Sequence, residues 1–139
     1  MNVMARMELD TALVRRVLTD FVRDEVTKVG FTRAVLGLSG GIDSAVSCAL
    51  AAEALGAENV LALILPYRTS SPASEGDARL VADKFGVPTR KLEITDMAEG
   101  YFAQLSALSD KRRGNVMARA RMIAIYDQSE EWHGLVIGT

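Results

Sequence analysis

The chain has 139 residues, a length that predicts one domain, residues 1–139, with room for a hydrophobic core. Hydrophobic residues make up 49% and charged residues 24%, and the net charge of −2 offers no basic footprint for nucleic acid. The single cysteine, Cys48, excludes an internal disulfide framework. No apolar run approaches the roughly 20 residues that cross a bilayer, and residues 1–7 lack the apolar centre of a signal peptide. We therefore expect a cytoplasmic protein without a membrane partner.

The first predicted element is an amphipathic helix over residues 9–29. Its apolar residues recur at helical spacing, and its charged residues fall largely on the other side. Gly30 matches the glycine that commonly follows a helix. We expect this helix to cover the sheet or to meet a partner subunit.

Residues 34–38 are short and apolar, as is typical of a strand buried on both faces. A glycine-rich loop follows, and then an alanine-rich helix over residues 44–55 that Gly56 ends. Such a junction directs several backbone N–H groups at one point, where the helix adds partial positive charge. The loop therefore predicts a phosphate or pyrophosphate site. Asp43 within it would repel an anion unless a divalent cation lies between them.

The remaining pattern alternates strands and helices. Residues 60–65 form a second buried strand, which a polar loop over residues 67–72 and a helix to about residue 85 follow. Residues 87–94 contain a third, more polar strand that suits a sheet edge. A helix to about residue 108, a mobile polar loop over 109–114, a long helix over about 115–131 and a fourth strand over 135–137 complete the order.

This order predicts an α/β fold: a Rossmann-like parallel sheet of about four strands, with helices on both faces and right-handed crossovers. Ligands of such sheets bind beyond the C-terminal ends of the strands. Residues 37–44, 67–71 and 138–139 all follow strands, so we expect one cleft to collect all three.

Spacing excludes two common phosphate loops. A Walker A loop needs a lysine that is absent here, and a dinucleotide fingerprint needs another glycine spacing and an acidic residue after the next strand. The segment Ser39-Gly40-Gly41-Ile42-Asp43-Ser44 instead resembles the pyrophosphate loop of the N-type ATP pyrophosphatases, whose fold is adenine nucleotide alpha hydrolase-like. These enzymes split ATP between its α- and β-phosphates. A glycine-rich turn of purely structural value is the alternative.

Further segments narrow the resemblance to one family. Residues 114–122, which begin Gly-Asn-x-x-Ala-Arg, together with Tyr126 and the pair Gly138-Thr139, are similar to NAD synthetase. GMP synthetase, asparagine synthetase and tRNA-thiolation enzymes share the first loop but lack this element. No glutaminase domain precedes the loop, so the similarity is to the ammonia-dependent form or to the synthetase part of the glutamine-dependent form.

The resemblance implies a ligase that uses ATP, deamido-NAD and ammonia, with magnesium as the metal ion and a homodimer as the assembly. Asp43 would bind Mg²⁺, and Asn115 and Arg119, four residues apart on one helix face, would contact deamido-NAD. The implied ATP-binding residues are Gly37, Leu38, Ser39, Gly40, Gly41, Ile42, Asp43, Ser44 and Thr139. No catalytic residue is assigned, because this chemistry asks a protein mainly for positioning and charge stabilisation.

Other polar residues receive weaker or structural interpretations. Residues of the loop after the second strand are weaker candidates for adenosine or phosphate contacts, namely Arg68, Ser70 and Ser71. Arg112 and Arg121 are expected to be solvated charges, His133 to be structural and Cys48 to be a small buried residue. For Asp43 the alternative is a carboxylate that favours the helix start, and for Arg119 it is a solvated surface arginine.

NAD synthetases continue past the matching Gly-Thr pair with a second magnesium-binding glutamate, a lysine and further contacts. We therefore expect a domain incomplete at its C-terminus, a fragment with little synthetase activity alone. Two alternatives stay open: another ATP pyrophosphatase that amidates or thiolates its substrate, and a non-catalytic nucleotide-binding module.

Overall fold

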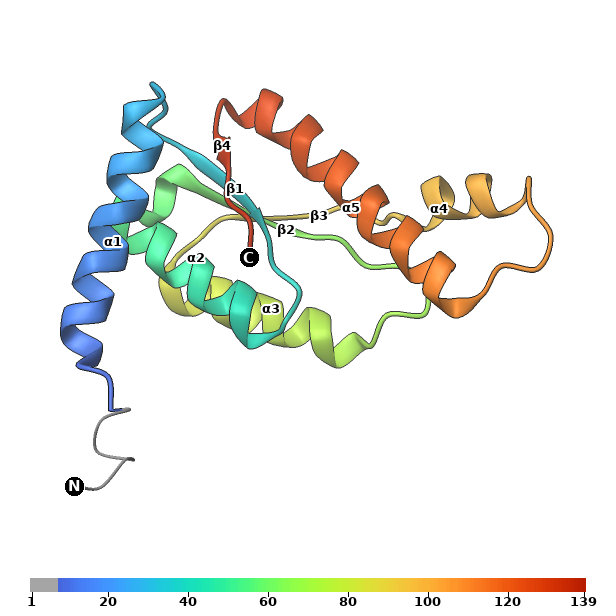
Figure 1. The fold of residues 1–139 in the computed structure, drawn as a ribbon, viewed down its shortest axis with the longest axis horizontal. Helices are drawn as coiled ribbons and strands as arrows, with labels where there is room; N and C mark the ends of the chain where they lie inside the picture. Colours follow the sequence, from blue (N-terminus) through green and yellow to red (C-terminus); the bar gives the residue numbers. More distant parts are fainter. Residues whose placement is uncertain (1–7) are drawn as a thin grey trace.

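The computed structural model describes residues 8–139, which form a parallel four-stranded sheet with the order β3-β2-β1-β4. The strands are β1 (Ala34–Gly37), β2 (Val60–Ile64), β3 (Thr89–Lys91) and β4 (Leu135–Val136). The predicted α/β fold with a four-stranded parallel sheet is confirmed (Figure 1). The prediction about a signal peptide concerns residues 1–7 and lies outside the described residues.

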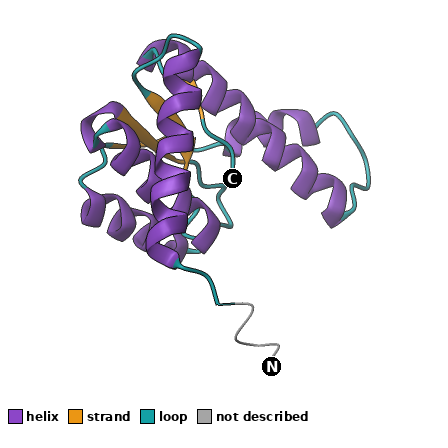
Figure 2. Ribbon diagram, turned by 60° about the vertical axis from the view of Figure 1, so that its left-hand side comes forward, coloured by secondary structure: helices purple, strands orange, loops and turns teal. Residues whose placement is uncertain are grey.

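Different helices cover the two faces of this sheet (Figure 2). On one face, α2 (Ile42–Leu55) and α3 (Pro72–Phe85) pack over Leu36 and Ala62. On the other face, α4 (Thr95–Phe102) and α5 (Asp110–Trp132) pack over Val35 and Leu61. Successive strand residues point to opposite faces, so both faces need apolar residues. This requirement explains why β1 and β2 are apolar throughout.

The helix α1 (Thr11–Lys28) packs against α2 and forms a layer outside it. Asp10 begins the helix, and its carboxylate accepts a hydrogen bond from the Leu13 N–H at 3.0 Å. Thr19 and Val26 are buried, whereas most of the predicted apolar stripe is exposed: Leu9, Leu13, Val17 and Phe21. This helix was expected either to cover the sheet or to meet a partner subunit. Covering the sheet does not explain why these apolar residues are exposed.

The boundaries around α5 differ from the prediction. The mobile polar loop predicted over residues 109–114 is wrong, because α5 begins at Asp110. The Ser109 hydroxyl accepts a hydrogen bond from the Arg112 N–H at 3.3 Å and caps the helix. Lysine and arginine are also good helix formers. The helix before it ends at Phe102 and not near residue 108, so the connecting segment comes earlier in the chain.

A 3-10 turn, η2 (Ala57–Asn59), joins α2 to β2. None of the helices in residues 8–139 combines the length and the apolar character that a membrane span requires.

Candidate nucleotide-binding site

The glycine-rich loop joins the C-terminal end of β1 to the start of α2. β1 is also where the sheet order reverses, because β2 and β3 lie on one side of it and β4 on the other. Ligands of open parallel sheets bind in the crevice at such a point. The Ile137 N–H donates to the Val35 carbonyl at 2.9 Å, so the chain after β4 continues beside β1. Gly138 and Thr139 follow at this edge and are exposed.

Two glycines of this segment lie in close packing, and the packing is strict at Gly40. Gly40 has a φ of +89°, and a Cβ atom there would lie 2.4 Å from the carbonyl oxygen of Ser74 in α3. A side chain would therefore be strained and would also collide with backbone. At Gly37 a Cβ would lie 3.2 Å from the Ile125 side chain of α5. Helices from both faces thus press on the strand–loop junction and hold it in place.

The two serines of the loop differ in exposure, although the hydroxyls of both make hydrogen bonds within the loop. Ser44 is 5% exposed; its hydroxyl accepts from the Ser39 N–H and donates to the Gly41 carbonyl, both at 3.2 Å. The Ser39 hydroxyl accepts from the Gly41 N–H at 3.3 Å, and Ser39 is exposed and lines a cavity. The position of Ser44 indicates that it shapes the loop, whereas Ser39 lies at the wall of the cavity.

The start of α2 is suited to an anion. Its N-cap residue is Gly41, which provides no side-chain cap. The first amides of the helix therefore keep their donors for a ligand, and the helix dipole favours negative charge there. The N-terminus of α3 lies beside the same loop, because Ser74 contacts Gly40. Two helix N-termini thus add positive potential at this edge of the sheet.

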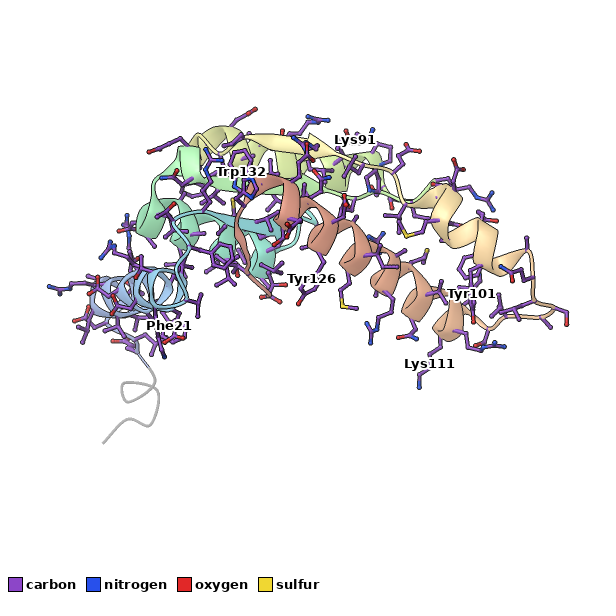
Figure 3. All side chains as sticks on the ribbon, turned by 90° about the horizontal axis from the view of Figure 1, so that it is seen from above. Phe21, Lys91, Tyr101, Lys111, Tyr126 and Trp132 are labelled. Carbon is purple, nitrogen blue, oxygen red and sulfur yellow. The ribbon has the colours of Figure 1, made fainter. Side chains whose placement is uncertain are left out.

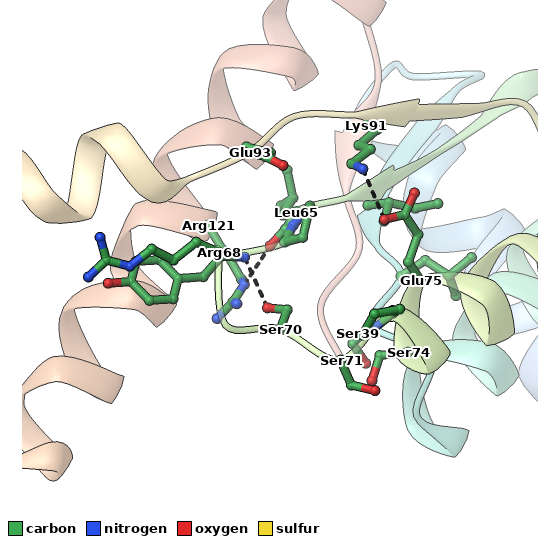
Figure 4. Close-up of a pocket in the computed structure, with 15 residues that line it drawn as sticks. Ser39, Leu65, Arg68, Ser70, Ser71, Ser74, Glu75, Lys91, Glu93 and Arg121 are labelled. Atoms are coloured by element: carbon green, nitrogen blue, oxygen red, sulfur yellow. Dashed lines mark hydrogen bonds and ion pairs between the residues drawn. The ribbon is translucent and has the colours of Figure 1, made fainter.

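A cavity of about 510 Å³ opens next to this loop, between the ends of β1, β2 and β3 and the start of α3 (Figure 4). Cavities of this size hold small molecules such as nucleotides. Its polar lining residues are Ser39, Arg68, Ser70, Ser71, Ser74, Glu75, Lys91, Glu93 and Arg121. Three weaker candidates from the sequence therefore lie at the cavity: Arg68, Ser70 and Ser71.

The structure does not bring every predicted site residue to this cavity. Of the predicted nucleotide loop, Leu38 and Ser39 line it directly. Asn115 and Arg119 are exposed on α5 and, like Thr139, do not line it. Their assigned roles stay predictions.

Arg121 corrects one prediction. It was expected to be a solvated charge, yet it is partly buried, and its Nε donates to the Leu65 carbonyl at 2.9 Å. Burial lowers the pKa of its guanidinium. Helix phase is the sequence feature that indicates this placement, since Arg121 lies four residues from both Met117 and Ile125, which pack against the core.

Two ion-pair clusters frame the cavity. Glu75 of α3 lies 3.0 Å from both Lys91 of β3 and Arg79, and these cations, Lys91 foremost, lower the pKa of its carboxyl. On the other side, the Tyr67 hydroxyl donates to Glu99 of α4. Arg68 and Arg113 lie 3.3 and 3.6 Å from the same carboxylate. The clusters tie the loop after β2 to α4 and α5, and α3 to β3.

Asp43 is a carboxylate at this edge that suits a magnesium ion. Mg²⁺ in nucleotide sites is held by one or two carboxylates together with substrate phosphates and water. Asp43 is exposed in the first turn of α2, beside the amides that would hold a phosphate. No group of three or more histidine, cysteine or acidic side chains within residues 8–139 could hold a metal alone. The donor set therefore fits an ion that arrives with its nucleotide.

The chain is similar to known proteins in both its sequence and its fold. A family model described as NAD synthase matches residues 14–139. An NH(3)-dependent NAD(+) synthetase of Trichlorobacter lovleyi is 55% identical over 136 residues, which are 98% of this chain and 50% of that protein. The chain spans about half the length of the curated relatives it matches.

Two solved structures have the same fold. One is the NH3-dependent NAD synthetase from Campylobacter jejuni in complex with the nitrate ion, with a TM-score of 0.88 and 34% identity over 94% of this chain and 57% of that one. The other is the glutamine-dependent NAD+ synthetase from Acinetobacter baumannii in complex with ADP. Its TM-score is 0.87, at 34% identity over 93% of this chain and 25% of that one.

Proposed function

The chain belongs to the NAD synthase family, and we propose that it supplies the ATP-binding part of a synthetase that makes NAD from deamido-NAD, ATP and ammonia. The observation that carries this proposal is the uncapped start of α2 beside a nucleotide-sized cavity at the switch point of the sheet. The structurally similar A. baumannii enzyme is in complex with ADP, which supports an adenine nucleotide as the ligand.

The nucleotide loop is proposed to hold the phosphates that leave as pyrophosphate. Gly40 and Gly41 let the backbone approach the phosphates closely, and the first amides of α2 donate hydrogen bonds to them. The exposed hydroxyl of Ser39 would add a donor by turning from the Ser44 hydroxyl to the phosphates, while Ser44 keeps the loop in shape. Mg²⁺ held by Asp43 and the phosphates would neutralise the charge that develops on the leaving group.

The other substrate is proposed to approach along α5. Asn115 and Arg119 share one face of that helix and are exposed. An arginine there can bind a phosphate or a carboxylate through two parallel hydrogen bonds. The nicotinate carboxylate of deamido-NAD would attack the α-phosphorus of ATP and displace pyrophosphate. Ammonia would then attack the adenylated carbonyl and displace AMP, which leaves the amide of NAD.

This chemistry needs no nucleophile from the protein, since the substrates provide both attacking groups. The chain contributes positioning and positive potential, which are the main sources of catalysis in transfers of this kind. The nitrogen source of the whole protein stays open between ammonia and glutamine, because relatives of both kinds share this fold.

A homodimer and a cytoplasmic location are part of the proposal. Apolar residues are exposed on α1 at Phe21 and on α5 at Tyr126, and both lie toward the same side of the molecule (Figure 3). A second copy that covered this side would remove the two patches from water. Sedimentation velocity of the chain measures this association directly.

Binding experiments on the chain itself test the proposed function. We expect ATP to bind in calorimetric titrations, with an affinity that Mg²⁺ raises in the parent chain but not in Asp43→Asn. We also expect Arg119→Ala to weaken deamido-NAD binding roughly tenfold or more, as loss of a charged hydrogen bond does. ATP binding should be unchanged in that variant, and Arg112→Ala is the matched control on the same helix.

The outcomes separate the proposal from its alternatives. A parent chain that binds no ATP would contradict the proposal. If Arg119→Ala binds deamido-NAD as the parent does, while ATP binding persists, another ATP pyrophosphatase activity becomes the better assignment. Binding of ATP without any binding of deamido-NAD favours a nucleotide-binding module.

A further inference from the structure

Arg121 is a charged side chain on the packed side of a helix. Its neighbours Ala120 and Ala124 are buried against the sheet, and Ile125 one turn later contacts Gly37. Arginine is seldom placed in such surroundings without a partner for its charge. The position therefore requires an explanation beyond helix formation.

The protein supplies only part of what this guanidinium can bind. Nε donates to the Leu65 carbonyl at 2.9 Å, and this is the hydrogen bond that the described residues give it. In residues 8–139 no carboxylate lies within 4.0 Å of Arg121, and Glu93, which lines the same cavity, forms no ion pair with it. Several other arginines each pair with a carboxylate, namely Arg15, Arg23, Arg68, Arg79, Arg90 and Arg113.

The orientation of Arg121 directs its remaining donors to the cavity. With Nε bonded to Leu65 at the end of β2, the side chain is held at one edge, and no acceptor within residues 8–139 bonds its terminal amino groups. Arg121 lines the cavity together with Ser39 and Ser70 (Figure 4). Burial also lowers the pKa of this guanidinium, because it removes water from around the charged form. A partly desolvated cation at the wall of a cavity fits an anionic ligand.

We propose that Arg121 binds the α-phosphate of the nucleotide through its terminal amino groups. This inference rests on the proposed function, in which the loop at residues 39–44 holds the two phosphates that leave. Arg68 and Lys91, the other cations at the cavity, are paired with carboxylates, so Arg121 is the partner for the phosphate that stays on the adenosine. A guanidinium held at Nε presents its two other nitrogens as a fork that matches two phosphate oxygens.

The experiment compares ligands that differ only in their phosphates. Adenosine, AMP, ADP and ATP are titrated without metal into the ¹⁵N-labelled chain, and amide shifts give each dissociation constant. We expect Arg121→Gln to weaken the binding of AMP, ADP and ATP roughly tenfold or more each. The binding of adenosine should be unchanged. Arg121→Lys should recover part of the loss, because it keeps the charge but not the fork. Arg112→Gln, an exposed arginine of the same helix, should match the parent for all four ligands.

Three results would overturn the inference. If Arg121→Gln weakened the binding of adenosine as much as that of the three nucleotides, Arg121 would only shape the cavity through its hydrogen bond to the Leu65 carbonyl. Unchanged AMP binding in Arg121→Gln would place the α-phosphate elsewhere and would leave the proposed function standing. A parent chain that binds none of the four ligands would remove both proposals together. Thermal unfolding of each variant shows whether the hydrogen bond to Leu65 also contributes to stability. All titrations are run well below the unfolding midpoint of the least stable variant.

Discussion

Ser44 and Arg119 represent two regions of the molecule that are held in opposite ways. Ser44 is 5% exposed, and its hydroxyl bonds the backbone of its loop at Ser39 and Gly41. Arg119 is exposed on α5. The loop region is fixed by backbone before any ligand arrives. The outer face of α5 presents long side chains that a ligand must order, at a cost in side-chain entropy. Substitutions should therefore affect folding and binding together in the loop, and binding alone on α5.

The largest effect is expected for Gly40→Ala. The added Cβ would combine a φ of +89° with an approach of 2.4 Å to the Ser74 carbonyl, so the loop must move away from α3. We expect a stability loss of roughly 2 kcal/mol or more and no detectable ATP binding, measured by urea unfolding and by calorimetry. Gly76→Ala is the matched control, since a Cβ there meets nothing within 4 Å. Retained ATP binding in Gly40→Ala would show that the loop is not as tightly fixed as this contact indicates.

A smaller loss is expected for Ser44→Ala. The variant removes the acceptor of the Ser39 N–H and the donor to the Gly41 carbonyl. Loss of such hydrogen bonds costs about 0.5–1.5 kcal/mol each, and the same urea titrations measure it. The affinity for ATP should decrease together with the stability of the fold, because the loop loses the hydrogen bonds of Ser44. Ser47→Ala, one turn further along α2, is the control. If Ser44→Ala loses ATP binding but no stability, Ser44 contacts the phosphates directly.

The smallest effect is expected at Glu75, outside both regions, and it depends on pH. Lys91 and Arg79 lower the pKa of this carboxyl in the folded chain below its ordinary value of 4.5. A lowered folded-state pKa adds stability at pH values above the ordinary pKa, and this contribution disappears as the pH falls through the folded-state pKa. Glu75→Gln should therefore be slightly less stable than the parent at pH 7 and equal to it in strong acid. Thermal midpoints measured from pH 7 down to pH 3 test this, and a constant difference across that range would contradict it.

Much of the fold was predictable because it depends on local patterns. The apolar runs at β1 and β2 each determine their own strand, and the helix after the first loop was also predicted, although α2 begins at Ile42 and not at residue 44. Predictions failed around α5, where the charges of residues 110–113 were taken for a loop although Ser109 caps a helix there. Composition indicated polarity correctly, but polarity does not distinguish an exposed helical turn from a loop.

The candidate site was predictable on the loop side and less so elsewhere. The loop at residues 39–44 contains its glycines, serines and aspartate in one segment, so spacing alone indicates an anion site. Arg121 is 56 residues from its partner Leu65 along the chain, and Glu75 meets Lys91 across two elements. No local pattern predicts such pairs. Only the helix phase shared with Ile125 places Arg121 on the packed side of α5.

The sequence by itself determined the order of strands and helices and the strand–loop–helix junction at residues 37–44, because each depends on residues close together in the chain. Tertiary structure alone decided that Ser74 closes against Gly40 and that Arg121 reaches the end of β2. It also decided that the cavity lies between β1, β2 and β3 and not at Asn115 or Thr139. The physical reason is the strand order β3-β2-β1-β4, which brings distant segments to one edge of the sheet.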